Sequence, residues 1–309
     1  MSNSVELECV TKSFGAKVAV DRLDLAVPEG SIYGFIGPNG SGKTTTLRLM
    51  LRIFQPDSGR VVVLGADQGK AADQRLGYLP EERGLYKRMK VVDQIDYFAR
   101  LKGRYDRRPA ITQWLERLDA ASWANQRVDS LSKGMAQKIQ FIAAVIAEPR
   151  LVILDEPFSG LDPVNLELLQ QAVRDLRTAG TTVIFSTHDM AIAERMCDTI
   201  LMIFQGRKVL DGTLAEIQSK YPIGKVRLRL VGNADVPPDS AGVAAAWRVD
   251  GYQQLTLAAG WQPPALLREL AARHEVEHFE VVRPTLHDIF VDIARPDVLG
   301  ADVPGQESA

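Results

Sequence analysis

The sequence predicts an α/β protein of two domains, in which a larger strand-and-helix domain precedes a smaller one. Three observations support this prediction. A glycine-rich loop joins an apolar strand, residues 32–36, to an amphipathic helix over residues 47–54. A second apolar run, of strand length, ends in two acids, Asp155 and Glu156. The pattern changes near residue 221, where a new series of short strands and helices begins.

Length and composition are those of a globular protein. The chain has 309 residues, of which 46% are hydrophobic and 25% are charged, enough for about two domains with sizeable cores. The formal net charge of −2 gives no electrostatic reason to expect a nucleic-acid partner. The N-terminus has no secretory signal pattern, and no apolar run approaches the ~18 to 20 residues that cross a bilayer. We therefore expect any membrane role to depend on a partner protein.

The two cysteines, Cys9 and Cys197, lie far apart in the sequence and suggest neither a metal pair nor a disulfide framework. A reducing, cytosolic compartment fits this cysteine usage best. We expect each cysteine to act as a small buried hydrophobe.

The chain is predicted to open with short strands at residues 5–10 and 24–27. Phe14 lies in the turn region between them. It either packs in the core, which is the commoner role of an aromatic residue, or lies flat against a nucleotide base.

The loop after the first apolar strand has the pattern G-x-x-x-x-G-K-[ST], between the strand and the helix that make this pattern specific. Its glycines let successive backbone N–H groups point at a phosphate chain, and the helix N-terminus adds partial positive charge. Lys43 can reach the β- and γ-phosphates, and the Thr44 hydroxyl suits Mg²⁺, which prefers oxygen ligands. The pattern predicts a P-loop NTPase. The predicted nucleotide contacts here are Gly37, Pro38, Asn39, Gly40, Ser41, Gly42, Lys43, Thr44 and Thr45.

Strands are predicted next at residues 61–65 and 76–79, and residues 91–150 are then almost wholly helical in pattern. Within this helical insert Ser132 is a natural helix cap. Taken alone, Ser132 and the residues after it indicate only the start of a helix.

The apolar run at residues 151–154 predicts a central buried parallel strand, and its acids follow where open α/β sheets bind ligands. One carboxylate there can hold Mg²⁺ through water, and the next can act on an attacking water. An isolated Asp-Glu pair could equally be a turn and helix cap. The following strand, residues 182–185, delivers His188 and is expected to neighbour the strand that carries the acids.

A hairpin is predicted over residues 200–210, and beyond it lies the smaller unit. Its predicted elements are a strand at 226–231, a hairpin about 250–251, a helix at 264–273, a strand at 276–282 and a helix at 285–293. We predict the main domain at residues 1–220, its helical subdomain at about 88–150, the small α/β domain at 221–294 and a disordered tail at 295–309.

Taken in order, these motifs resemble the ATP-binding subunit of an ABC transporter over residues 5–220. They are Phe14, the loop at 37–44, Gly77-Tyr78-Leu79-Pro80-Glu81, Leu131-Ser132-Lys133-Gly134-Met135, Leu154-Asp155-Glu156-Pro157, Ser159-Gly160-Leu161-Asp162 and His188. Other P-loop families, including kinases and GTPases, lack the middle motifs. The small C-terminal unit looks like the extension found on ATPase subunits of bacterial ABC-2 type exporters. The implied fold is an ABC ATPase with a mixed sheet core and a helical subdomain, followed by a small α/β domain.

The resemblance implies an ATPase that works as a head-to-tail dimer with ATP and Mg²⁺. Each P-loop would face the partner's Ser132, Lys133 and Gly134, and Asp162 would signal across the dimer. Asp155 would support Mg²⁺, Glu156 would be the general base, and His188 would contact the γ-phosphate. Glu81 would face Mg²⁺ from the loop after its strand. A separate membrane permease would dock near Glu81 and the helical insert, at the cytoplasmic face of the inner membrane.

The chain departs from the family pattern in two motifs. Glu81 stands where the family usually has glutamine, and Leu131–Met135 reads LSKGM where LSGGQ is usual. Glu81 adds negative charge near the phosphates, and Lys133 adds positive charge at the opposing face. We expect these two charges to compensate for one another.

A soluble ABC-type ATPase acting on ribosomes or DNA is the alternative from another class. Such proteins usually carry two cassettes, long coiled coils or zinc clusters, and this chain has one cassette, no heptads and no cysteine cluster. The sequence does not distinguish between two roles for the C-terminal unit, a regulatory or dimer-stabilising module and a structural cap. The transported substrate would be chosen by the membrane subunit.

Overall fold

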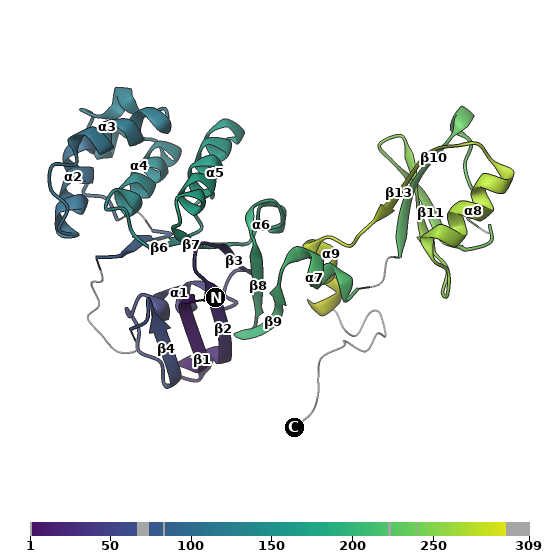
Figure 1. The fold of residues 1–309 in the computed structure, drawn as a ribbon, viewed down its shortest axis with the longest axis horizontal. Helices are drawn as coiled ribbons and strands as arrows, with labels where there is room; N and C mark the ends of the chain where they lie inside the picture. Colours follow the sequence, from purple (N-terminus) through teal and green to yellow (C-terminus); the bar gives the residue numbers. More distant parts are fainter. Residues whose placement is uncertain (1, 67–73, 83, 222–223, 239, 295–309) are drawn as a thin grey trace. The chain divides into compact units, whose positions relative to one another are not determined.

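The computed structural model describes residues 2–66, 74–82, 84–221, 224–238 and 240–294. The chain divides into two compact units, Met1–Leu214 and Ala215–Ala309 (Figure 1). The domain boundary predicted at residues 220 and 221 stays a prediction. The predicted disordered tail, residues 295–309, lies outside the described residues.

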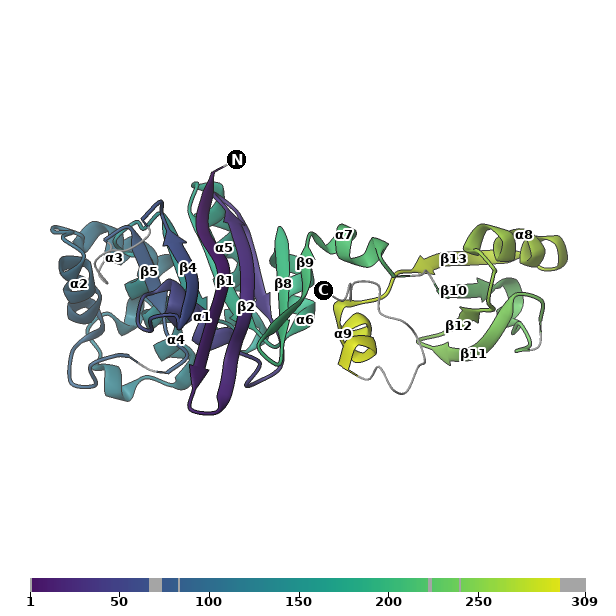
Figure 2. The ribbon, with the colours of Figure 1, turned by 90° about the horizontal axis from the view of Figure 1, so that it is seen from below.

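A long antiparallel ribbon opens the first unit. β1 (Asn3–Phe14) pairs with β2 (Lys17–Pro28) on one side and with β4 (Ser58–Val63) on the other (Figure 2). The prediction of short strands here is wrong, because irregularities in the pairing of β1 let it continue past positions that break the apolar alternation. Cys9 lies at one of them, with φ +48°, and its side chain is exposed, so the expectation of a buried Cys9 is also wrong.

The second sheet of this unit is mixed, as predicted, and has the strand order β5-β6-β7-β3-β8-β9. The strands are β3 (Ile32–Ile36), β5 (Leu76–Leu79), β6 (Leu151–Asp155), β7 (Thr182–Thr187), β8 (Thr199–Phe204) and β9 (Arg207–Gly212). All neighbours run parallel except β8 and β9, which form the predicted antiparallel hairpin. The α/β fold class is therefore confirmed.

β6 is buried on both faces, which explains its continuous apolar sequence. Val152 and Leu154 face a core that they share with the helical part of the unit. Leu151 and Ile153 face a second core that contains α1 (Lys43–Met50) and the antiparallel sheet. The strand therefore lies between two packed layers, and the polar residues Asp155 and Glu156 lie at its carboxyl end.

The described residues of this unit form five α-helices besides α1. They are α2 (Val91–Leu101), α3 (Arg108–Arg117), α4 (Lys133–Val145), α5 (Pro163–Thr178) and α6 (Met190–Met196), with short 3-10 turns at Ala121–Trp123 and Val128–Ser130. Ser132 caps α4 as predicted, because its hydroxyl accepts a hydrogen bond of 3.3 Å from the Met135 N–H. Lys138 is buried in α4 and donates to the Leu118 carbonyl at 2.7 Å, which anchors α4 to the end of α3.

The second unit is a four-stranded antiparallel sheet, in the order β11-β12-β10-β13, with one face covered by α8. Its elements are α7 (Leu214–Ser219), β10 (Lys225–Leu230), a 3-10 turn (Val231–Asn233), β11 (Val243–Val249), β12 (Tyr252–Leu257), α8 (Pro263–Arg273), β13 (Val276–Val282) and α9 (Leu286–Ala294). The strand alternation buries Val226, Leu228 and Leu230 against Leu266 and Leu270 of α8.

Candidate functional site

The loop between β3 and α1 has a backbone that only glycine tolerates at its key positions. Gly42, the residue before the first helical residue, has φ +113°, and a side chain there would collide with the Ala19 carbonyl. Gly40 has φ +78°. Positive φ angles at these glycines let the loop turn backbone N–H groups toward an anion at the N-terminus of α1, where the helix adds partial positive charge.

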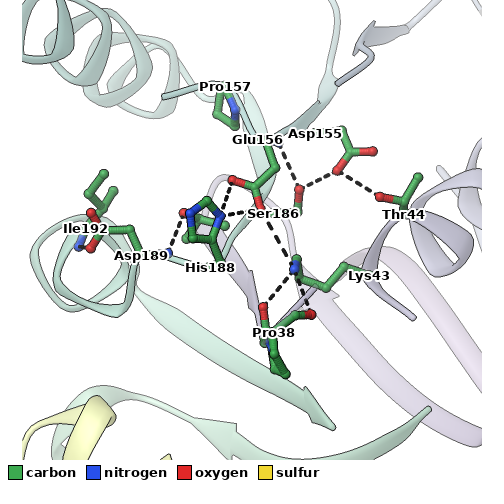
Figure 3. A network of polar contacts seen from close by, with 12 residues as sticks. Pro38, Lys43, Thr44, Asp155, Glu156, Pro157, Ser186, His188, Asp189 and Ile192 are labelled. Atoms are coloured by element: carbon green, nitrogen blue, oxygen red, sulfur yellow. Dashed lines mark hydrogen bonds and ion pairs between the residues drawn. The ribbon is translucent and has the colours of Figure 1, made fainter. Parts of the chain in front are cut away.

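Lys43 is the first residue of α1, and its side chain folds back over the loop. Its Nζ donates to the carbonyls of Gly37 at 2.7 Å and Pro38 at 3.2 Å, and lies 3.8 Å from Glu156 Oε1 (Figure 3). Burial lowers the pKa of this amine, while the carboxylates of Glu156, Asp155 and Glu81 act in the opposite direction. A buried cation held beside a loop of N–H groups can bind the phosphates of a nucleotide.

Asp155 ends β6 and is almost fully buried. Its Oδ1 accepts hydrogen bonds from Ser186 Oγ at 2.5 Å and Thr44 Oγ1 at 3.3 Å (Figure 3). Its Oδ2 is buried and has no hydrogen-bond partner among the described residues. Ser186 lies beside Asp155 because β6 and β7 pair in parallel with these two residues in register.

Glu156 follows Asp155 and has a left-handed backbone, with φ +51°. Its N–H donates to Ser186 Oγ at 2.9 Å, and His188 Nδ1 lies 3.1 Å from both of its carboxylate oxygens (Figure 3). The side chain of Glu156 is 10% exposed, whereas that of His188 is 56% exposed. The tertiary structure thus brings Lys43, Thr44, Asp155, Glu156 and His188 together, although they come from distant parts of the sequence.

A pocket of about 520 Å³ lies over the loop. Its lining residues are Phe14, Lys17, Ala19, Asn39, Gly40, Gly42, Lys43, Thr44, Thr45, Glu81 and Glu156. Phe14 is 46% exposed, and its ring contacts that of Phe54 edge-on, with ring centroids 5.3 Å apart. Lys17 and Ala19 line the pocket without having been predicted, because no local signal on β2 marks them.

Of the other predicted nucleotide contacts, Gly37, Pro38 and Ser41 belong to the loop but do not line the pocket, and the rest lie elsewhere. The described residues that line the pocket do not include Ser132, Lys133 or Gly134. These three residues lie at the start of α4, where Lys133 is next to Gly160 and Gly134 is next to Leu161. Asp162 caps α5 by accepting hydrogen bonds from the N–H groups of Val164 and Asn165. These bonds, together with one from the Asn165 side chain, lower its pKa.

Sequence reasoning missed two residues that hold the site together, Ser186 and Gln137. Ser186 bridges Asp155 and Glu156, as described above. Gln137 Nε2 donates to the Pro157 carbonyl at 2.9 Å and lies 3.5 Å from the Glu156 carbonyl. Ser186 could have been suspected, since it ends the strand expected beside β6; no local pattern distinguishes Gln137 from other helical glutamines.

The P-loop on a mixed sheet, with an acid pair at the end of β6, which β7 separates from the P-loop strand β3, and a helical insert, defines a nucleotide-binding ATPase of the P-loop class. Two family models match the chain: "ABC transporter" over residues 20–159, and "ATP-binding protein DrrA1-3-like, C-terminal domain" over residues 212–294.

Curated relatives and solved structures agree with these matches. An uncharacterized ABC transporter ATP-binding protein, YhaQ of Bacillus subtilis, is 41% identical over 93% of this chain and 97% of its own length. The Nod factor export ATP-binding protein I of Sinorhizobium fredii is 36% identical over 68% of this chain and 62% of its own length. A solved ATP-binding subunit of an ABC transporter has a TM-score of 0.65 and 27% identity, over 70% of this chain and 92% of that chain.

The chain belongs to the ATP-binding proteins of ABC transporters, a family of ATPases, and the resemblance noted from its motifs is confirmed. It is an ABC transporter ATP-binding subunit. None of the described helices is long and apolar enough to span a bilayer. The alternative role on ribosomes or DNA gains no support from these relatives.

Proposed function

We propose that this chain is the ATP-hydrolysing motor of an ABC exporter and drives a separate membrane permease. The observation that carries the proposal is the position of Glu156. Its carboxylate lies 3.1 Å from His188 Nδ1 and 3.8 Å from Lys43 Nζ, beside the pocket over the P-loop. Relatives named for Nod factor export support the direction of transport.

ATP would bind with its phosphates on the loop and its base near Phe14. Lys43 would exchange the Gly37 and Pro38 carbonyls, its present partners, for β- and γ-phosphate oxygens. The exposed ring of Phe14 lines the same pocket and offers a face for stacking.

The residues present fit a magnesium ion. The Oδ2 of Asp155 is a buried carboxylate oxygen that lacks a hydrogen-bond partner among the described residues, and the Thr44 hydroxyl lies beside the same carboxylate. Thr44, Asp155 through water, and Glu81 would hold Mg²⁺, an ion that prefers oxygen ligands and retains several waters. When bound, Mg²⁺ neutralises charge that develops on the phosphate oxygens.

Hydrolysis would use Glu156 as the general base. The carboxylate takes a proton from the attacking water, whose oxygen forms a bond to the γ-phosphorus while the bond to the ADP oxygen breaks. His188 donates from Nδ1 to the carboxylate, which orients the base, and would contact the γ-phosphate. The products are ADP and inorganic phosphate.

The composite site of a head-to-tail homodimer accounts for Ser132, Lys133 and Gly134, which lie outside the pocket lining of their own chain. They would contact the γ-phosphate on the partner's P-loop, and Asp162 would relay the state of one site to the other. A solved cassette of the same fold is described as a dimer in a post-hydrolysis state with ADP and Pi. Loss of the bridging phosphate would open the pair.

The permease would dock near Glu81 and the helical insert, and would hold the subunit at the cytoplasmic face of the inner membrane. Exposed aromatic side chains support this location. Tyr97 lies on α2 of the insert and Tyr86 lies just before the insert; they are 37% and 53% exposed, and their rings contact each other with centroids 5.6 Å apart. Exposed apolar groups of this kind are typical of surfaces that a partner covers.

The test is the Glu156→Gln variant, assayed for ATPase activity and for mass in solution with and without Mg-ATP. Loss of a general base should lower kcat by about 100-fold or more, while ATP binding persists and ATP converts a monomer to a dimer. Glu167→Gln, at an exposed position on α5, is the matched control and should keep wild-type activity. A dimer without nucleotide would assign association to the C-terminal unit. ATP binding without any dimer would contradict a shared site in the isolated subunit.

A further inference from the structure

The turn that carries Glu156 is held in an unfavourable backbone conformation by contacts on both sides. A non-glycine residue at φ +51° is uncommon, and such residues persist where the surroundings over-determine them. On one side, the Glu156 N–H donates to Ser186 Oγ at 2.9 Å. On the other side, its carbonyl accepts from the Ser159 N–H at 3.2 Å and lies 3.5 Å from Gln137 Nε2.

Gln137 is the only one of these partners that comes from outside the sheet and its own turn. Its side chain is buried on α4, and its amide also donates to the Pro157 carbonyl at 2.9 Å. One amide group thus engages two successive carbonyls of the turn. An uncharged donor suits this place, since two carbonyl oxygens repel an acceptor and a buried cation would be costly.

The helix that carries Gln137 begins at Ser132, the residue proposed to face the partner's nucleotide. One turn further along α4, Gln140 Nε2 donates at 3.2 Å to the carbonyl of Glu82, the neighbour of Glu81. Residues three apart lie on the same side of a helix. One side of α4 therefore contacts both the turn of the proposed base and the loop of the proposed magnesium ligand.

We propose that Gln137 is a positioning residue for hydrolysis: it holds the turn that orients the Glu156 carboxylate and links that orientation to the position of α4. The inference rests on the proposed function of Glu156. When Ser132 engages the partner's ATP, α4 and Gln137 move as one body, and the turn follows. Hydrolysis is thereby tied to closure of the dimer.

The experiment uses Gln137→Met, which keeps the length and volume but removes the donor, and Gln137→Glu, which replaces the donor with a carboxyl group. Gln170 is the matched control, a buried glutamine on α5 whose Nε2 has no hydrogen-bond partner among the described residues. Each full-length variant is measured for kcat, KM, ATP affinity and melting temperature. Gln137→Met should lower kcat about 10-fold and leave KM and ATP affinity within about twofold. Gln170→Met should change neither kcat nor KM.

The pH profile of Gln137→Glu separates positioning from a general loss of packing. A protonated carboxyl group donates a hydrogen bond and a carboxylate does not. Burial beside two carbonyl oxygens favours the protonated form of a carboxyl group at this position. The ratio of kcat in Gln137→Glu to kcat in the wild type should therefore rise as the pH falls from about 8.5 to about 6.0. The charged side chains around the turn are the same in both proteins, so the substituted carboxyl group is the one titratable group that distinguishes them; these side chains are Lys43, Asp155, Glu156 and His188.

An unchanged kcat in Gln137→Met would overturn the inference, as would a ratio for Gln137→Glu that is flat with pH. A rise in KM with kcat unchanged would also overturn it, since that result describes a nucleotide contact. These failures differ from failure of the proposed function itself. If Glu156→Gln keeps its ATPase activity, the base has been wrongly assigned, whatever Gln137 does.

Discussion

Ser186 provides the sharpest test of how the site is held together. The side chain is fully buried at the end of β7, and its hydroxyl donates to Asp155 Oδ1 at 2.5 Å and accepts from the Glu156 N–H at 2.9 Å. Ser186→Ala removes both bonds while leaving a side chain that fits the same space. Among the described residues, the Asp155 carboxylate then keeps one hydrogen bond, from Thr44, and the Glu156 N–H loses its only side-chain partner.

The two lost bonds set the size of the effect. A hydrogen bond to a charged group contributes about 1.5–3 kcal/mol, and leaving a buried N–H unsatisfied costs about 1–3 kcal/mol. The bonds share one hydroxyl and are not additive, so we expect the free energy of unfolding to fall by about 3 kcal/mol. Because the left-handed backbone of Glu156 loses one of its constraints, kcat should also fall, by about 10-fold.

Urea unfolding followed by tryptophan fluorescence measures this loss. The relevant transition is the one that Mg-ATP shifts, since a ligand stabilises only the unit that binds it. Ser130→Ala is the control: its exposed hydroxyl donates to the Arg127 carbonyl at 2.7 Å, and its removal should cost no more than about 0.5 kcal/mol. If Ser186→Ala lowers the free energy of unfolding by less than about 1 kcal/mol, the reasoning is refuted. Equal decreases in Ser186→Ala and Ser130→Ala would refute it as well.

Three further predictions concern the pocket and the proposed dimer. Burial lowers the pKa of Lys43, and bound phosphates should raise it again. ATP binding should therefore take up protons at alkaline pH, and ATP affinity should fall as the pH rises through the lowered pKa of the free protein. Calorimetry in buffers of different ionisation enthalpy measures this proton uptake, and a result of no uptake would contradict the prediction. Phe14→Ala should weaken ATP binding about 3- to 10-fold and Phe14→Tyr should restore it, whereas equal affinities would exclude base stacking. Glu81→Gln and Lys133→Gly should show a coupling of about 0.5–1 kcal/mol in ATP-dependent dimerisation, and a double-mutant cycle without coupling would remove the idea that these charges compensate.

The sequence alone was sufficient for the features that depend on neighbouring residues. The loop glycines are recognised because the turn needs their backbone freedom, and Ser132 because a hydroxyl caps a helix. The run at 151–154 is recognised because its apolar residues are continuous over the length of a strand. The order of these motifs along the chain is by itself enough to indicate the family. The same local reasoning failed for β1, because its pairing with β2 and β4 continues past bulges that interrupt the apolar pattern.

Only the tertiary structure decided which polar groups meet. Pairing of β6 with β7 puts Ser186 between Asp155 and Glu156, and packing of α4 brings Gln137 to the turn that follows β6. The left-handed backbone of Glu156 has no signature in its neighbours, since a glutamate before a proline does not indicate φ +51°. Such a conformation exists because distant hydrogen bonds stabilise it, and distant contacts are set by the packing of the whole unit rather than by the residues on either side.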